Sequence, residues 1–215
     1  MAKYCAAVIV FVALLIAFNL TYRPKSNGRL TVRDRVVRGE TAPTISYSRR
    51  SPAMLRAVTG VFGLIFATAA YDSRPQPDPD AILPVPESDG YGTTAVYALV
   101  ALYFWSCNLA FVFGRLQVGY VAFTSEGIYQ RGWSFESFLP WRAVLGVHSA
   151  YREYPMTLII AYNDSWERRY TATWPWRIDR LPTVSLIEID HRKMGDDAVR
   201  IHDYVTAKVA ERSGR

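Results

Sequence analysis

The chain has 215 residues, of which 50% are hydrophobic and 14% aromatic, and its formal charge is +6. This apolar content excludes a chain that is disordered throughout, and 13 glycines and 2 cysteines exclude collagen-like and disulfide-rich proteins. Charged residues are almost absent from three stretches and crowded between them, which argues against a simple soluble globule.

An uncharged stretch, residues 4–22, follows directly after Lys3. At about 1.5 Å per residue, a helix of this length crosses a bilayer core of about 30 Å, and tyrosines at both ends suit the membrane interface. We therefore predict a first transmembrane helix over residues 4–22. The alternative is a cleaved signal peptide, but no small-residue cleavage site follows Phe18, and cleavage would put the next, basic segment outside.

Residues 23–52 form a basic segment that we expect to be a cytoplasmic linker. In the simplest interpretation its arginines only set the membrane topology. The alternation over residues 29–37 predicts a short strand or a segment that lies on the inner leaflet. The alternative is an electrostatic patch for anionic lipid, in which each cation near the surface contributes about 1 kcal/mol.

Two further apolar stretches predict a second transmembrane helix over residues 53–71 and a third over residues 93–114. The second includes Arg56, whose long side chain can reach the headgroups. Between the two helices, residues 72–92 are acidic and contain five prolines, which favours an extended, solvated loop.

Small and polar residues on these two helices predict close helix packing. Thr59, Gly63 and Ala67 recur at every fourth position, so they form one face that lets helices approach closely. Asn108 is expected to point at a helix partner and away from lipid. We expect the second and third helices to pack on each other, with a second copy of the chain as the alternative partner.

The distribution of charge predicts the orientation. Residues 23–56 hold nine basic and two acidic residues, whereas residues 72–93 hold one basic and five acidic residues. Because cytoplasmic loops retain Lys and Arg, the first segment is expected inside and the second outside. Three spans then place the N-terminus outside and residues 115–212 in the cytoplasm.

From Leu116 onward the pattern changes from helical to strand-like, with short apolar runs separated by turn residues. Seven strands are predicted, over residues 118–123, 128–133, 137–139, 143–149, 156–162, 167–173 and 184–189. Ser125-Glu126-Gly127 predicts a hairpin turn in which Gly127 takes a positive φ. Asn163-Asp164 predicts a second hairpin, between the fifth and the sixth of these strands.

The end of the chain predicts an amphipathic helix. Asp196 and Asp197 follow Gly195 and suit the helix start, where an aspartate caps the backbone and complements the dipole. One apolar stripe follows, made of Ala198, Ile201, Val205 and Val209. We therefore expect an α+β membrane protein with three transmembrane helices, followed by about seven antiparallel strands in a curved sheet or barrel and a C-terminal helix.

The order of residues in this domain resembles a known family. Thr124 to Tyr129, followed by Leu139-Pro140-Trp141-Arg142 and then by Val144 and Val147, is similar to the pattern of bacterial PH-like domains, in which a T-x-x-G-I hairpin precedes P-W-x-x-I-x-x-V. Many such proteins carry a pair of transmembrane helices before the domain, and the resemblance covers roughly residues 45–212. It implies a PH-like domain over residues 115–212 of a bacterial inner-membrane protein, and it implies no catalytic activity.

Residues with catalytic or metal-binding chemistry form no motif. His148, His191 and His202 are too scattered for a metal site and are expected at the surface or rim of the domain. A nucleophile elbow, a P-loop, a zinc-protease motif and a dinucleotide fingerprint are all lacking from the sequence. We expect no enzyme, no cofactor and no metal. The alternative is an enzyme whose Arg and His residues meet only in the fold.

Arginine and tryptophan side chains of the strand domain are the candidates for binding an anionic headgroup or a partner: Arg131, Arg142, Arg168, Arg169, Trp174 and Trp176. Arg168 and Arg169 are neighbours in a predicted strand, so they should point to opposite faces. The simpler interpretation of the arginines is solvated strand faces and local ion pairs. Trp174-Pro175-Trp176 cannot be central strand and is expected at the rim of the core or at the membrane interface.

These observations predict a membrane-anchored interaction or scaffold protein that presents a cytoplasmic PH-like domain to a protein partner or to the inner leaflet. The expected partners are the membrane, anionic lipid, and a protein or a second copy of the chain, without nucleic acid. The alternative is an accessory subunit of a membrane transport or envelope-assembly complex that acts through its helices.

Overall fold

The computed structural model describes residues 27–75, 88–151, 155–162, 166–177, 179 and 184–213. The described part divides into a helical unit, Ala53–Phe113, and a strand unit, formed by the residues up to Pro52 and those from Gly114 onward. The predicted first transmembrane helix, residues 4–22, lies outside the described residues. Most of the acidic loop, residues 76–87, also lies outside them.

Two long apolar helices, α2 (Arg50–Asp72) and α3 (Ser88–Val112), make up the helical unit. Their segments Pro52–Asp72 and Tyr91–Val112 have mean hydropathies of 1.7 and 1.8, and each is long and apolar enough to cross a membrane. Only 11% and 17% of these segments are buried inside the structure, so they are not core helices of a globular domain.

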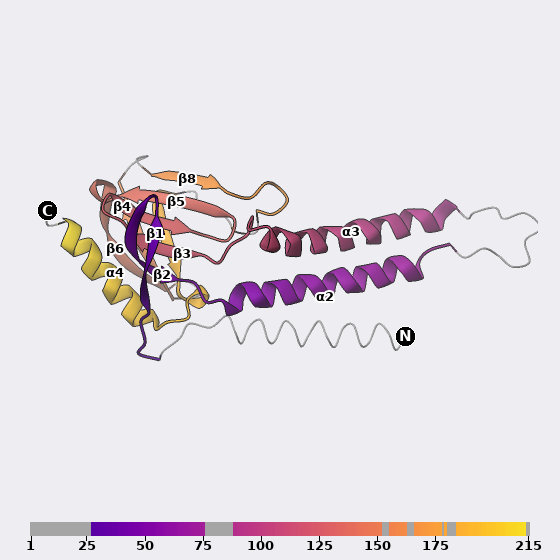
Figure 1. Ribbon diagram of the computed structural model, residues 1–215, viewed down its shortest axis with the longest axis horizontal. Coiled ribbons are helices and arrows are strands. Elements are labelled where there is room, and N and C mark those ends of the chain that lie inside the picture. The colour runs from indigo at the N-terminus through magenta and orange to yellow at the C-terminus, as the bar shows by residue number, and fades with distance from the viewer. Residues whose placement is uncertain are drawn as a thin grey trace, which may run out of the picture. The chain divides into compact units, whose positions relative to one another are not determined.

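Helices α2 and α3 lie side by side (Figure 1), and residues that the sequence singles out make contacts between them. Asn108 Nδ2 donates to Thr59 Oγ1 at 2.8 Å, so the amide points at the neighbouring helix. A Cβ atom on Gly63 would lie 2.6 Å from the Trp105 ring, so this close approach requires glycine. Ala67, the third member of the predicted small-residue face, is exposed.

Strands of the second unit form two antiparallel sheets (Figure 1). The six-stranded sheet has the order β1-β2-β3-β4-β5-β8, with β1 (Val32–Val37), β2 (Glu40–Ser46), β3 (Tyr120–Phe123), β4 (Gly127–Arg131), β5 (Phe135–Pro140) and β8 (Glu167–Tyr170). The three-stranded sheet has the order β6-β7-β9, with β6 (Val144–Tyr151), β7 (Pro155–Ala161) and β9 (Leu186–Asp190). The 3-10 helices η1 (Trp141–Ala143) and η2 (His191–Lys193) and the helix α4 (Ala198–Ser213) complete the described elements.

Part of the segment expected to be a linker is a β-hairpin. The strand expected over residues 29–37 is present as β1, and it pairs along its length with β2. The two-residue turn between them, Arg38-Gly39, has φ values of 52° and 87°, as turns that match the twist of paired strands require. Because β2 pairs in turn with β3, residues 32–46 belong to the strand unit.

The second predicted hairpin is wrong. Strand β7 pairs with β6 and β9, whereas β8 pairs with β5 in the other sheet. The burial of the two strands explains this. Ile159 in the central strand β7 is fully buried, whereas the charged side chains of residues 167–169 are exposed, as suits an edge strand.

The turn at Gly127 is present, but its glycine is needed for another reason than the one expected. Positive φ values occur at Gly28, Gly39 and Gly114 among the described glycines, and not at Gly127. A Cβ atom at Gly127 would lie 2.3 Å from the Leu139 carbonyl oxygen, because β5 approaches closely. Steric exclusion therefore selects glycine at this position.

Inward-facing residues of both sheets form the core with one face of α4. The fully buried members are Ile45, Val121, Ile128, Leu139, Ile159, Ile187, Ile189, Ile201 and Val205. Gln130 joins the two sheets, since its Nε2 donates to the Glu188 carbonyl oxygen at 2.6 Å. The predicted cap of α4 is present: Asp197 Oδ1 accepts from the backbone N–H groups of Val199 and Arg200.

The fold class is therefore α+β, with three helices and nine antiparallel strands among the described residues. The predicted single curved sheet or barrel is replaced by two sheets. The larger of them is not closed, because β1 and β8 are its edges. The two strands beyond the expected seven are β1 and β2, which precede the apolar helices in the chain.

Candidate functional site

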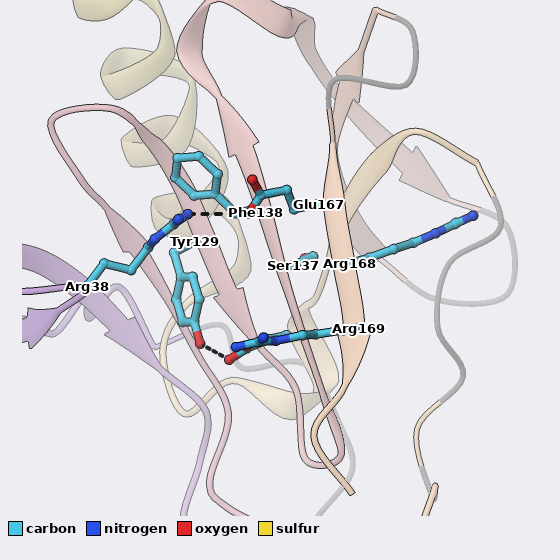
Figure 2. A pocket seen from close by; sticks show the side chains of 8 residues that line it. Arg38, Tyr129, Ser137, Phe138, Glu167, Arg168 and Arg169 are labelled. Atoms are coloured by element: carbon cyan, nitrogen blue, oxygen red, sulfur yellow. Dashed lines mark hydrogen bonds and ion pairs between the residues drawn. The ribbon is translucent and has the colours of Figure 1, made fainter.

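An open groove of about 450 Å³ lies on the outer face of the six-stranded sheet, over β4, β5 and β8 (Figure 2). Tyr129 and Phe138 belong to it, and their strand neighbours Ile128 and Leu139 face the core. The groove is lined by Arg38, Tyr129, Glu136, Ser137, Phe138, Glu167, Arg168 and Arg169. It thus combines an aromatic floor with charged walls.

Glu136 organises one wall of the groove. Its Oε2 accepts a hydrogen bond from the Tyr129 hydroxyl at 2.5 Å and one from Arg131 Nη1 at 2.9 Å, and its Oε1 pairs with Arg169 Nε. Register places Arg131 and Arg169 on either side of Glu136, on the two strands that flank β5. One carboxylate therefore fixes three polar side chains from two strands.

This network sets the ionisation of its members. Burial alone would raise the pKa of Glu136, but hydrogen bonds from Tyr129 and Arg169 and the charges of Arg169 and Arg131 outweigh it and lower the pKa. Glu136 therefore stays an anion. Burial, followed by the hydrogen bond to Glu136, raises the pKa of Tyr129, so its hydroxyl stays a donor.

Arg38 forms the opposite wall from the β1–β2 turn. Its guanidinium lies 4.2 Å from the centroid of the Phe138 ring and 3.7 Å from Glu167 Oε2 (Figure 2). The residue has a φ of 52°, which a non-glycine side chain adopts at a cost of roughly 1–2 kcal/mol. The attraction between the Arg38 guanidinium and the Phe138 ring offsets this cost. It also holds the cation over the aromatic floor.

The groove carries more positive than negative charge. Its lining includes three arginines, Arg38, Arg168 and Arg169, and two glutamates, Glu136 and Glu167. Arg131, which is not part of the lining, pairs with Glu136. The Arg169 side chain is 79% exposed although its Nε is bonded to Glu136, and a guanidinium has five N–H donors. The arrangement can therefore bind one further anionic group, such as a carboxylate, through a planar fork of donors.

The structure separates the four arginines predicted as binding residues. Arg131 and Arg169 meet at Glu136, whereas the Arg168 side chain runs away from them, as strand alternation predicts (Figure 2). The Arg168 guanidinium stacks on the Trp166 ring at 4.5 Å. Arg142 is exposed on η1, outside the groove.

Both predicted tryptophans lie in the segment after β8, outside the groove. Trp174 is 80% exposed, whereas Trp176 is half-buried, and the Trp176 N–H donates to the Thr173 carbonyl oxygen at 2.8 Å. The two side chains therefore have different environments although they are two residues apart.

The expectation of surface or rim histidines is wrong for His191. His148 is exposed and His202 is half-buried, but His191 is only 3% exposed. Thr157 Oγ1 lies 2.9 Å from His191 Nε2 and 3.1 Å from His202 Nδ1, so the fold brings two histidines to one buried hydroxyl. No local sequence pattern indicates this cluster, because its three residues come from β7, η2 and α4.

Neither His191 nor His202 lines the groove. Among the described residues, no group of three or more His, Cys, Asp or Glu side chains could hold a metal ion. The one described cysteine, Cys107, is a buried free thiol on α3.

Sequence reasoning missed Arg38, Tyr129, Glu136, Phe138 and Glu167 as groove residues. Arg38 lies in the segment that was predicted to be a linker. Arg38-Gly39 between two β-prone segments is nevertheless a signal for a hairpin turn. Glu136 and Glu167 become neighbours only through the pairing of β5 with β8, which joins segments about 30 positions apart. Local patterns cannot specify such a pairing.

Comparison with models of protein families, with curated proteins and with solved structures finds no match to this chain.

Proposed function

We propose that the protein is a membrane-anchored docking protein. Its strand unit would bind an acidic group of a protein partner in the groove between Arg38 and Arg169. The observation that carries the proposal is the open groove, in which Arg38 and Arg169 each pair with a carboxylate beside an aromatic floor. A carboxylate brought by a partner would balance the remaining positive charge, and its charge-assisted hydrogen bonds would be stronger than neutral ones.

The anchoring part of the proposal is supported by the way the chain enters and leaves the helical unit. The Tyr47 N–H donates to the Gly119 carbonyl oxygen at 2.8 Å, and β2 pairs with β3. These residues flank the two apolar helices in sequence, so both ends of the helix pair must lie on one side of any membrane that it crosses. Two consecutive spans satisfy this requirement.

The charge asymmetry supports a cytoplasmic strand unit. Most of the nine basic residues in residues 23–56 belong to that unit, whereas the acidic segment 72–93 runs from the end of α2 to the first residues of α3. The proposal therefore keeps the strand unit in the cytoplasm of a bacterial cell and the loop between α2 and α3 outside. A PH-like domain and a first span over residues 4–22 remain parts of the same proposal.

The alternative function, an accessory subunit that acts through its helices, loses its specific support. The small-residue face and Asn108 suggested a partner in the membrane. Thr59 and Gly63 contact α3 of the same chain, and Asn108 bonds Thr59. These contacts account for Thr59, Gly63 and Asn108 without a second protein, whereas Ala67 is exposed.

The test compares full-length protein purified from native membranes, in wild type and in two variants. In the first variant, Arg38→Asn and Arg169→Ala remove two groove cations, and asparagine tolerates the left-handed turn. In the control variant, Arg142→Ala removes an exposed arginine outside the groove. Melting temperatures in detergent verify that all three proteins are folded.

We expect one or more proteins to co-purify with wild type and with the Arg142→Ala control. Their recovery should fall about tenfold or more with the groove variant, because each charge-assisted hydrogen bond contributes about 1.5–3 kcal/mol. Equal recovery with all three proteins, or recovery of no protein, contradicts the proposal.

A further inference from the structure

A turn after β8 presents one tryptophan to the outside of the strand unit. Residues 170–176 carry no charged side chain, and Trp174 near the middle of this segment is 80% exposed. A tryptophan side chain buries about 150–250 Å² when it is covered, so its exposure to water is costly. The turn is followed directly by Arg177, which is exposed and stacks on the Tyr170 ring at 4.5 Å.

The backbone of this turn is fixed to the sheet on both sides. The N–H groups of Thr171 and Ala172 donate to the Ser134 carbonyl oxygen at 2.8 and 3.2 Å. On the other side, the Asp179 N–H donates to Ser134 Oγ at 3.1 Å, and the Asp179 carboxylate accepts from the Trp133 N–H. Trp174 is therefore presented by an anchored turn.

The same end of the strand unit carries both connections to the apolar helices. The Gln117 N–H donates to the Trp133 carbonyl oxygen at 3.3 Å, so the chain that leaves α3 is bonded directly beside Ser134. On the other connection, the Ser48 N–H donates to the Lys193 carbonyl oxygen at 2.7 Å, and Lys193 Nζ pairs with Asp179 at 3.4 Å.

These connections are short. Gln117 is four positions after Phe113, a distance of at most roughly 14 Å, and the start of α2 at Arg50 is two positions after Ser48, a distance of at most roughly 7 Å. A helix that crosses a membrane ends at the headgroups. Only a few residues of chain therefore connect the ends of α2 and α3 to the Trp133–Asp179 region of the strand unit.

From this connectivity we propose that the Trp174 turn inserts into the headgroup interface of the membrane that α2 and α3 cross. Tryptophan is enriched at that depth because its ring is apolar and its N–H group can still donate to water or lipid. The absence of charge over residues 170–176 permits insertion, and the Arg177 guanidinium that follows can pair with lipid phosphates. This proposal rests on the anchoring part of the proposed function and not on the groove.

The test uses the full chain with Cys5 and Cys107 replaced by serine, reconstituted in phosphatidylcholine–phosphatidylglycerol vesicles. A single cysteine at Thr173, which is exposed beside Trp174, carries an environment-sensitive fluorophore. The control position is Glu126, which is exposed in the turn between β3 and β4. This turn lies at the end of the hairpin opposite to the Tyr120–Arg131 pair. Lipids with a quencher near the headgroup report contact with the interface.

We expect the probe at position 173 to be quenched several-fold more strongly than the probe at position 126. Adding Trp174→Ser to the Thr173→Cys protein should reduce quenching at 173 to the level of the Glu126 probe. Since no other protein is present, equal quenching at the two positions in protein that floats with the vesicles overturns the inference and leaves the proposed function standing. Protein that fails to float with the vesicles overturns both.

Discussion

The buried His191 side chain couples the stability of the strand unit to pH. Burial lowers its pKa to about 4, and the nearby His202 acts in the same direction, whereas Asp190 and Asp197 oppose the shift. Between pH 6.5, near the pKa of an unfolded histidine, and pH 4, the unfolded chain binds a proton that the folded chain does not. We therefore expect the free energy of unfolding to fall by about 2 kcal/mol from pH 7 to pH 5.

Chemical unfolding of the full chain in detergent, followed by tryptophan fluorescence at both pH values, measures this loss. In His191→Leu the pH dependence should largely disappear, although stability at pH 7 also drops because Thr157 loses a hydrogen-bond partner. His148→Gln serves as the control, since His148 is exposed. An unchanged pH dependence in His191→Leu would contradict the assignment.

At the scale of elements, local patterns predicted where strands lie but not which strands pair. Short apolar runs separated by turn residues located β3 to β9 to within a few residues, because both signals can be recognised in the local sequence. The pairing of β8 with β5 joins segments that are distant in sequence, so no local pattern specifies it. Residues 163–164 predicted a hairpin turn between β7 and β8. The apolar strand β7 instead pairs with β6 and β9, and the charged strand β8 pairs with β5.

The α2–α3 pair gives a direct test of helix packing. Gly63→Leu should lower the melting temperature in detergent, because even its Cβ atom would lie 2.6 Å from the Trp105 ring and overpacking typically costs about 1–3 kcal/mol. Gly60→Leu on the same helix is the matched control, since nothing lies within 4 Å of a Cβ atom there. Equal melting temperatures for the two variants would show that this contact does not hold the helices together.

At the scale of the whole molecule, the strand unit is completed across the two apolar helices. Strand β2 precedes α2 and strand β3 follows α3, yet the two strands pair, and α4 is tied to the chain before β1 because Asp197 Oδ2 accepts from the Gly28 N–H at 2.9 Å. The sequence suggested a domain that begins after the last helix. It could not show that residues 27–48 complete that domain, because this depends on pairing between segments more than 70 positions apart.

This pairing makes the membrane topology testable with three probes. Single cysteines at Asn27, Ser88 and Glu126, in a background without Cys5 and Cys107, are treated with a membrane-impermeant maleimide in intact cells and again after permeabilisation. We expect labelling at position 88 in intact cells, because this position belongs to the acidic segment between the spans, and labelling at positions 27 and 126 only after permeabilisation. Different accessibility of positions 27 and 126 would contradict the pairing of β2 with β3 on one side of a membrane. Labelling of both in intact cells would keep that pairing but place the strand unit outside, and a docking partner would then have to be sought there.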